Sequence, residues 1–176
     1  MIKGKFVGLR AVEKYDLELL RDWRNKTDFR RNFREVRELS LTDQEDWLKY
    51  LQSTKDRNFM FTIVDLKTNN PIGACGLLYI NWNIRSADFS FYLGNEDIYI
   101  GDDEISIDSV SLLIDYGFKN LNLNKIWMEL YEFDTKKINF FTKHFKFKQD
   151  ALLRDNCFED GKYWNSVIIS LINRER

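Results

Sequence analysis

The chain of 176 residues is poor in proline, cysteine and histidine, with one, two and one copies respectively. The single proline, Pro71, leaves no proline-rich stretch that would serve as a linker between two domains. Two cysteines are too few for a disulfide framework, and a chain of this length buries enough surface to fold without one. We therefore expect one domain spanning residues 1–176, in a reducing compartment that we take to be the cytoplasm.

Long apolar runs and a surplus of positive charge are also missing. The sequence has no stretch of 18 apolar residues and does not begin with the apolar core of a signal peptide, so we expect neither a membrane-spanning segment nor export. The formal net charge of −1 leaves no excess of lysine and arginine to neutralise phosphates, so nucleic acid is not expected as a partner. With 44% hydrophobic and 31% charged residues, the composition is that of an ordinary globular protein.

Arginine, by contrast, is concentrated in one stretch of 17 residues. The six arginines in this cluster are Arg21, Arg24, Arg30, Arg31, Arg34 and Arg37. Guanidinium groups pair bidentately with phosphate or carboxylate, so the cluster fits an anionic group of a substrate. Acidic residues in the same stretch equally allow a solvated surface that is balanced by local ion pairs. We keep both interpretations open and name Arg34 and Arg37 as candidate substrate-binding residues.

The spacing of apolar residues predicts a succession of strands and helices. Alternating or β-branched runs predict strands over 5–12, 58–66, 72–80, 87–93, 125–131 and 162–171, and helical spacing predicts helices over 16–23, from 43 onwards, over 103–120 and over 134–144. Thr42 and Glu45 have the form of a capping box at the start of the second helix. The resulting order, β-α-α-β-β-β-α-β-α-β, predicts an α+β fold in which helices cover a mixed, mainly antiparallel sheet.

Several short motifs are spread over nearly the whole chain. They occupy residues 6–10 with 16–17, 23–25, 71–76, 87–93, 112–127 and 153–163. Their order and spacing resemble the GNAT superfamily of N-acetyltransferases, in particular the branch that includes ribosomal-protein alanine acetyltransferases. The resemblance implies a single GNAT-like domain that moves an acetyl group from acetyl-CoA, its cosubstrate, to a primary amine. The segment 87–93 resembles the strand whose splayed end receives the thioester, which makes Phe91, Tyr92 and Leu93 candidate cofactor-binding residues.

The segment before the helix at 103–120 departs from the family. There the resemblance implies that the CoA diphosphate rests on backbone N–H groups at a helix start, in the pattern R/Q-x-x-G-x-G/A. Ile98, Gly101 and Asp103 hold the patterned positions, so only the glycine is retained. Asp102, Asp103 and Glu104 place three carboxylates where a polyanion is expected. Either they cap the helix and occupy the anion site, or they turn outwards and leave the amides free. The candidate cofactor-binding residues here are Ile100, Gly101, Asp102, Asp103, Glu104 and Ile105.

The last helix also departs from the family. The family pattern N-x-x-A-x-x-x-Y ends in a tyrosine that is placed to protonate the leaving thiolate, and Asp134, Lys137 and Phe141 occupy those positions here. A phenyl ring has no proton to donate, so Phe141 is not the acid, although Asp134 and Phe141 stay candidates for contact with the cofactor. His144, near the end of this helix, is interpreted as a capping residue rather than as a catalyst.

Asp88 is the candidate catalytic residue. It matches a carboxylate on the central strand of many members of this branch, and a positioned carboxylate can take the proton of the acceptor ammonium. Its apolar neighbours at alternate positions equally allow a solvent-facing strand residue. Glu129 and Glu132 are weaker candidates for the base, and Cys75 is assigned to core packing. Trp82 is a candidate for the wall of the acceptor pocket.

Two functions stay open at this point. The first is acetyl transfer to a primary amine, which belongs either to a protein N-terminus or to a small molecule such as a nucleotide-linked amino sugar. The arginine cluster favours the acceptor with an anionic group. The second is a catalytically silent binding or regulatory module on a GNAT scaffold, for which the altered loop and Phe141 argue. No metal site is expected, and a homodimer stays open as a further partner.

Overall fold

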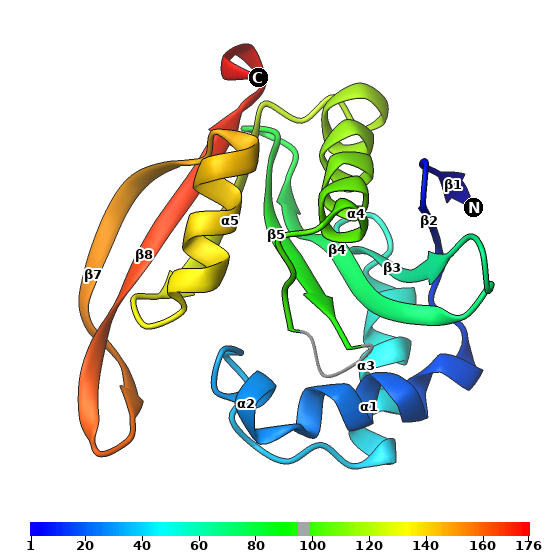
Figure 1. Ribbon diagram of the computed structural model, residues 1–176, viewed down its shortest axis with the longest axis horizontal. Coiled ribbons are helices and arrows are strands. Elements are labelled where there is room, and N and C mark those ends of the chain that lie inside the picture. The colour runs from blue at the N-terminus through cyan, green and yellow to red at the C-terminus, as the bar shows by residue number, and fades with distance from the viewer. Residues whose placement is uncertain (95–98) are drawn as a thin grey trace.

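An eight-stranded sheet runs through the protein in the computed structural model, which describes residues 1–94 and 99–176 (Figure 1). The strands are β1 (Ile2–Lys3), β2 (Val7–Ala11), β3 (Phe59–Asp65), β4 (Pro71–Asn81), β5 (Ser86–Leu93), β6 (Lys125–Tyr131), β7 (Lys148–Glu159) and β8 (Lys162–Ile172). They pair in the order β1-β2-β3-β4-β5-β6-β8-β7. All neighbours are antiparallel except β5 and β6, which run parallel. The predicted fold class is therefore confirmed.

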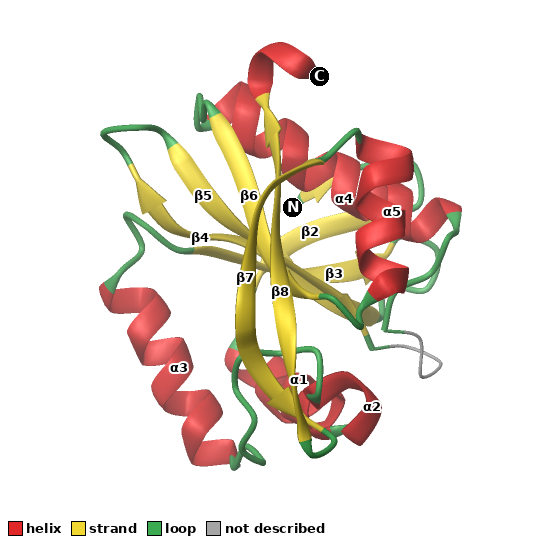
Figure 2. Ribbon diagram, turned by 90° about the vertical axis from the view of Figure 1, so that its left-hand side faces the viewer, coloured by secondary structure: helices red, strands yellow, loops and turns green. Residues whose placement is uncertain are grey.

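Helices cover both faces of this sheet. They are α1 (Leu17–Asn25), α2 (Thr27–Arg30), α3 (Leu41–Ser53), α4 (Glu104–Asp115) and α5 (Thr135–Phe145), with short turns η1 (Lys14–Asp16), η3 (Tyr116–Asn120) and η4 (Asn173–Glu175). Figure 2 shows α3 on one side of the sheet and α4 and α5 on the other. Within residues 1–94 and 99–176, no helix combines the length and the apolar character that a membrane crossing requires.

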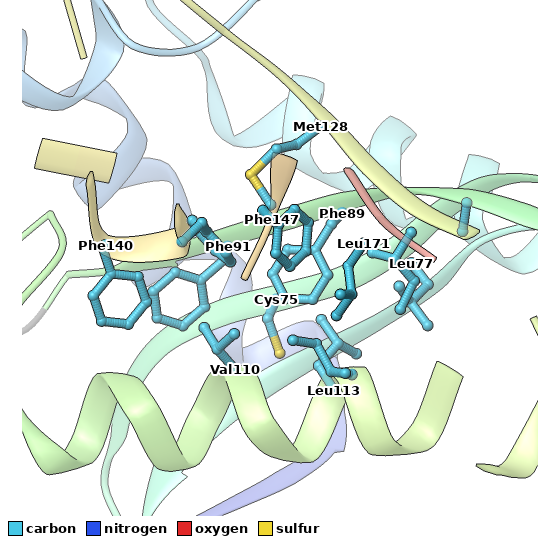
Figure 3. Packing of buried hydrophobic residues seen from close by; sticks show 14 of the residues in the cluster. Cys75, Leu77, Phe89, Phe91, Val110, Leu113, Met128, Phe140, Phe147 and Leu171 are labelled. Carbon is cyan, nitrogen blue, oxygen red and sulfur yellow. The ribbon is translucent and has the colours of Figure 1, made fainter. Parts of the chain in front are cut away.

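The main core lies between the sheet and α4 and α5 (Figure 3). Val110 and Leu113 of α4 are buried in one cluster with Leu77 of β4 and Phe89 of β5. Cys75 is fully buried in the same cluster, and burial raises the pKa of its thiol, so the thiol stays protonated and packs as an apolar group. The core assignment of this cysteine is confirmed.

Strand β5 is buried on both of its faces. Phe89 and Phe91 belong to the main core, whereas Tyr92 belongs to a second cluster with Leu20 and Trp23 of α1. Asp88 alternates with the core residues, and its side chain therefore lies on the face that this second layer covers. The alternation that suggested a solvent-facing carboxylate instead leads to a buried one, because both faces of the central strand are covered.

Three local predictions need correction. Helix α3 is capped by Ser40, not by Thr42: the Ser40 hydroxyl accepts from the Asp43 backbone N–H at 3.1 Å, and the Asp43 carboxylate accepts from the Ser40 N–H at 2.7 Å. The same Ser/Thr-x-x-acid form occurs in two registers two residues apart, so the motif alone did not identify the start. Helix α2 and strand β7 were missed, since α2 spans only four residues and β7 is an edge strand that is exposed along most of its length and shows no apolar alternation.

The sheet opens at its centre. The parallel pairing of β5 with β6 covers only Ser86 to Asp88 opposite Lys125 to Trp127. Beyond this point β6 stays paired with β8 as far as Tyr131, and β5 stays paired with β4 as far as Leu93. Between the described parts of the two strands, the backbone edge of β5 from Phe89 onwards is therefore not paired with β6. This unpaired edge is the feature that positions the site.

Candidate functional site

A cavity of about 550 Å³ lies where β5 and β6 diverge. Its walls come from both diverging strands, from β3 and β4, and from α1, α3, α5 and the segment between α2 and α3. Its acidic lining residues are Glu35, Asp43, Asp46, Asp88 and Glu129, and its basic lining residues are Arg24, Arg34, Arg37 and Lys137. Elements far apart in the sequence thus bring charges of both signs to one opening of the sheet. We call this opening the central cavity.

Asp88 lies in this cavity with only 5% of its surface exposed. Arg34 donates from Nη1 to Oδ2 of Asp88 at 2.8 Å, and its Nε lies 3.8 Å from a carboxylate oxygen of Glu129. Burial raises the pKa of Asp88, and the nearby Arg34 only partly opposes this effect. A carboxylate with a raised pKa is a stronger base than an exposed one, so this environment suits a group that takes a proton from an ammonium.

The arginine cluster is largely neutralised within the protein. Five of its six members form ion pairs with carboxylates: Arg21 with Glu18 and Asp22, Arg30 with Glu38, Arg31 with Glu159 and Asp160, Arg34 with Asp88 and Glu129, and Arg37 with Glu35. Arg34 and Arg37 both line the central cavity, as expected for candidate substrate contacts. The ion pairs nevertheless match the interpretation of a charge-balanced segment better than that of a free anion site.

Trp82 lies away from the central cavity. It belongs to the turn between β4 and β5, where its indole N–H donates to the backbone carbonyl of Asp56 at 2.9 Å. It lines neither of the two cavities that are described here, so the structure does not support its predicted place in the acceptor pocket. Tyr79 and Tyr92, which the sequence offered as candidates for the same pocket, do line the central cavity.

Lys137 is the site residue that sequence reasoning did not single out. It projects from α5 with 6% of its surface exposed, and its Nζ donates to the Phe91 carbonyl at 2.7 Å and to the Tyr99 hydroxyl at 2.9 Å. The Phe91 carbonyl belongs to the part of β5 that has separated from β6. Burial lowers the pKa of Lys137 to about 8, while Asp134 and Asp88 act in the opposite direction. The only sequence signal was a lysine where the family pattern has alanine.

The remaining family positions of α5 have structural roles. Asp134 caps the helix, because its Oδ1 accepts from the Lys137 backbone N–H at 3.2 Å, and its Oδ2 accepts from the Tyr99 hydroxyl at 3.3 Å. Phe141 is fully buried against the rings of Phe89 and Phe147 and lines neither cavity. Phe141 thus packs in the core, which agrees with its exclusion as an acid, and its contact with the cofactor stays a prediction.

The loop before α4 contains the predicted phosphate-binding residues, of which Ile98 lies outside the described part of the chain. Asp103 caps α4 through a bond from the Ser106 backbone N–H to Oδ1 at 2.7 Å. A Cβ at Gly101 would collide with Oδ2 of Asp103, so a larger residue there would displace the carboxylate that caps α4. Asp102 is turned outwards and is exposed. Asp103 thus matches the interpretation as a helix cap, and the exposed Asp102 matches only the outward orientation of the alternative.

Asp102 pairs with two basic side chains of α5. Lys143 donates to one carboxylate oxygen at 2.7 Å, and the His144 ring contacts the other. The hydrogen bonds from Lys143 and His144 lower the pKa of Asp102. His144 thus lies in the last turn of α5, near the helix end as predicted, and also contacts the loop; the C-cap residue is Lys146, which has a left-handed conformation.

A second cavity of about 640 Å³ adjoins this region. It is lined by Tyr99 and Ile100 from the loop, by Asp134 and Lys136 at the start of α5, and by residues of α2. Because Tyr99 lines the second cavity and Lys137 lines the central one, the hydrogen bond between these two side chains connects the cavities. On the edge of β5 beyond Asp88, the Phe91 carbonyl accepts from Lys137 and the Leu93 N–H donates to the Tyr99 carbonyl at 3.0 Å. The Asp103 carboxylate fits a diphosphate poorly, but the ammonium group of Lys143 lies close by, paired with Asp102.

A parallel strand pair that opens inside an antiparallel sheet, with a buried carboxylate at the opening, defines an acyltransferase of the GNAT type. Residues 7–144 match the family model of the acetyltransferase (GNAT) domain, and the chain belongs to this family. It is therefore an N-acetyltransferase that uses acetyl-CoA, as the sequence predicted.

The relatives refine this assignment. The chain is 31% identical to an uncharacterised N-acetyltransferase, p20, of Bacillus licheniformis over 115 residues, which cover 65% of this chain and 62% of that protein, less than two thirds of its length. It is 26% identical over 156 residues to a spermidine N(1)-acetyltransferase of Vibrio cholerae, covering 88% of this chain and 86% of that protein. A crystal structure of spermidine N-acetyltransferase from Vibrio cholerae in complex with CoA and spermine has the same fold, with a TM-score of 0.85, 22% identity and 96% coverage of both chains. Two of these three bear the name of a polyamine enzyme, and none is named for the ribosomal-protein branch.

Proposed function

We propose that this protein transfers the acetyl group of acetyl-CoA to a primary amine of a polyamine such as spermidine. The observation that carries the proposal is the buried Asp88, which lies at the divergence of β5 and β6 in a cavity with further carboxylates on its walls. The names of the spermidine acetyltransferases among the relatives support the same class of acceptor. Both cysteines are free, which agrees with a reducing cytoplasm as the place of action.

The charges of the central cavity fit a polycation. A polyamine is protonated at neutral pH, so the attacking nitrogen must first lose a proton, and Asp88 is the group placed to take it. Glu35, Asp43, Asp46 and Glu129 also line the cavity, where Glu35, Asp46 and Glu129 pair with Arg37, Lys49 and Arg34 and Asp43 caps α3, so the other ammonium groups have to compete with these partners. Arg34 occupies the carboxylate of Asp88 in the present structure, so a substrate ammonium has to displace its guanidinium.

The two acceptors considered from the sequence are less well supported. A nucleotide-linked amino sugar was favoured by the arginine cluster, but five of the six arginines have carboxylate partners within the protein. A protein N-terminus followed from the resemblance to the ribosomal-protein branch, whereas the relatives bear polyamine names. A polyamine agrees with both the relatives and the acidic side chains of the cavity.

A panel of acceptors tests this proposal. The purified protein is given acetyl-CoA with spermidine, with a peptide that begins in alanine or with a nucleotide-linked amino sugar, and release of the CoA thiol and the product mass are measured. We expect the highest kcat/KM with spermidine. Asp88→Asn is expected to lower kcat by about 100-fold or more because a general base is lost, while calorimetry shows unchanged binding of acetyl-CoA.

Asp150→Asn is the matched control, since Asp150 pairs with Lys125 on the sheet and lines neither cavity. A higher kcat/KM with the peptide or the sugar would show that this compound, and not the polyamine, is the acceptor. Binding of acetyl-CoA without turnover of any amine would instead point to the silent module.

A further inference from the structure

Acetyl transfer leaves a proton to be supplied. The acceptor nitrogen forms a bond to the acetyl carbon, the bond from that carbon to sulfur breaks, and the electron pair of the broken bond goes to sulfur. A thiol of this kind has a pKa of about 8.5, so the departing thiolate is stabilised by a nearby acid. Phe141, at the family's tyrosine position, has no such proton and is enclosed by other phenylalanine rings.

Lys137 lies one helical turn before Phe141 and presents an acidic N–H at the right place. Residues four apart share one face of a helix, but the longer lysine side chain reaches past the aromatic core to the edge of β5. Its Nζ is 2.7 Å from the Phe91 carbonyl, on the stretch of β5 that has separated from β6. The family resemblance places the thioester at this splayed end, and the hydrogen bond to Tyr99 joins the two cavities along the same path.

The surroundings of Lys137 adjust its acidity. The groups that face it are Asp134 on its own helix, Asp88 on β5, Tyr99 before α4, Arg24 on α1 and Arg34 after α2. Burial and the two arginines favour loss of the proton, whereas the two carboxylates favour its retention. The resulting pKa of about 8 lies close to that of a thiol, so a proton passes between nitrogen and sulfur with little change in free energy.

We propose that the ammonium group of Lys137 protonates the sulfur of CoA as the acetyl group is transferred, an inference that rests on the proposed function. The acceptor ammonium loses one proton to Asp88 before attack and a second to solvent after it. Sulfur gains one proton from Nζ, Lys137 regains a proton from solvent, and Asp88 releases its proton to solvent. One proton is thus released per acetyl group transferred, as conversion of an ammonium to an amide requires.

The first measurement does not depend on turnover. CoA is bound to the full-length protein, and the pKa of its thiol is measured from the ultraviolet absorbance of the thiolate. An adjacent ammonium stabilises the thiolate, so we expect the bound thiol to titrate about one unit lower in the wild type than in Lys137→Met. Lys119→Met is the control, because Lys119 is a surface lysine that pairs with Asp115 and lines neither cavity. Thermal unfolding of each variant checks that it is folded.

The second measurement is the pH dependence of kcat with spermidine. Lys137 has to be protonated to act, so wild-type kcat is expected to fall as the pH rises through about 8. In Lys137→Met, the fall of kcat at high pH should be absent. The value of kcat should be lower by about 100-fold, the usual contribution of one general acid, with little change in KM for acetyl-CoA. Lys137→Arg keeps a positive charge but holds its proton too tightly, so it should not restore kcat.

The outcomes separate this inference from the proposed function. If the thiol of bound CoA has the same pKa in wild type and in Lys137→Met, the role of Lys137 is overturned, whichever amine is acetylated. Restoration of kcat by Lys137→Arg would also overturn it, since a fixed positive charge would then suffice. A lowered thiol pKa without acetylation of spermidine supports Lys137 and rejects only the polyamine. A wild type that binds no CoA rejects both.

Discussion

The environment of the central cavity favours the neutral forms of its ionisable groups, whereas the loop before α4 favours the charged form. In the cavity, burial raises the pKa of Asp88 and lowers that of Lys137, so both groups are pushed towards their neutral forms. In the loop, Asp102 is exposed, and the hydrogen bonds from Lys143 and His144 lower its pKa, which favours the charged form. Charged groups in the cavity therefore lower the stability of the fold, whereas water and neighbouring side chains stabilise the charged group of the loop.

This difference distinguishes residues that act in the reaction from residues that stabilise the structure. A buried ionisable group lowers the stability of the fold unless it is fully compensated, so its presence in a cavity points to use in a reaction. Exposed carboxylates near a helix start stabilise that start and modulate the affinity for ligands. We therefore expect changes in the cavity to alter stability with pH, and changes in the loop to have smaller effects on folding and on cosubstrate affinity.

The largest effect is expected from the buried lysine. Between pH 8 and 10.5 the unfolded chain keeps the proton of Lys137 while the folded protein loses it, so the stability of the wild type rises with pH in this window. The shift from 10.5 to about 8 corresponds to about 3 kcal/mol. Relative to Lys137→Met, the free energy of unfolding of the wild type should therefore increase by about this amount from below pH 8 to above pH 10.5, measured by urea denaturation.

Lys119→Met, which removes a surface lysine, gives the baseline for loss of one titrating amine. The contrast between the two regions is wrong if the free energies of unfolding of wild type and Lys137→Met differ by a constant amount from pH 8 to 10.5. The folded protein would then hold the charged form of Lys137 without a loss of stability.

A smaller effect is expected where a carboxylate stabilises the fold. Asp103→Ala removes the acceptor of the Ser106 backbone N–H at the start of α4, and loss of such a cap costs about 1 kcal/mol. Urea denaturation at neutral pH measures this change, and Asp103→Asn, which can still cap the helix, should lose less. Equal loss in both variants would mean that the negative charge matters more than the hydrogen bond.

The sequence predicted the elements more completely than the site. The range of β6 was predicted without error, and the alternating run predicted as a strand over 87–93 is β5, Ser86–Leu93. Local patterns do not reveal which distant side chain meets a given one. Arg34 lies 54 positions before Asp88, and Lys137 lies 46 positions after Phe91, so these contacts appear only once the sheet has folded and α5 has packed on it.

The residues and the strand that the sequence did not predict were missed because local patterns do not reveal contacts between distant parts of the chain. Lys137 was visible only as a departure from a pattern, because its chemistry depends on the carbonyl that its Nζ reaches. Strand β7 was missed because an edge strand with an exposed surface has no apolar alternation to detect. Trp82 was predicted from its position near a strand end, and the turn it occupies points it away from the cavity instead.

The smallest effect is expected from the exposed carboxylate of the loop. Asp102 pairs with Lys143 and contacts His144, so Asp102→Asn should remove a negative charge from the loop where the diphosphate of acetyl-CoA is expected and leave the Lys143 ammonium without this partner. Calorimetry should show several-fold tighter binding of acetyl-CoA at low salt and little difference at high salt, because exposed charges are screened. Asp115→Asn, which removes the partner of Lys119 and Arg176 on the far end of α4, is the control and should not change the affinity. Weaker binding in Asp102→Asn would reverse the role of this aspartate, since it would then hold the two basic side chains in place for the phosphates rather than mask them.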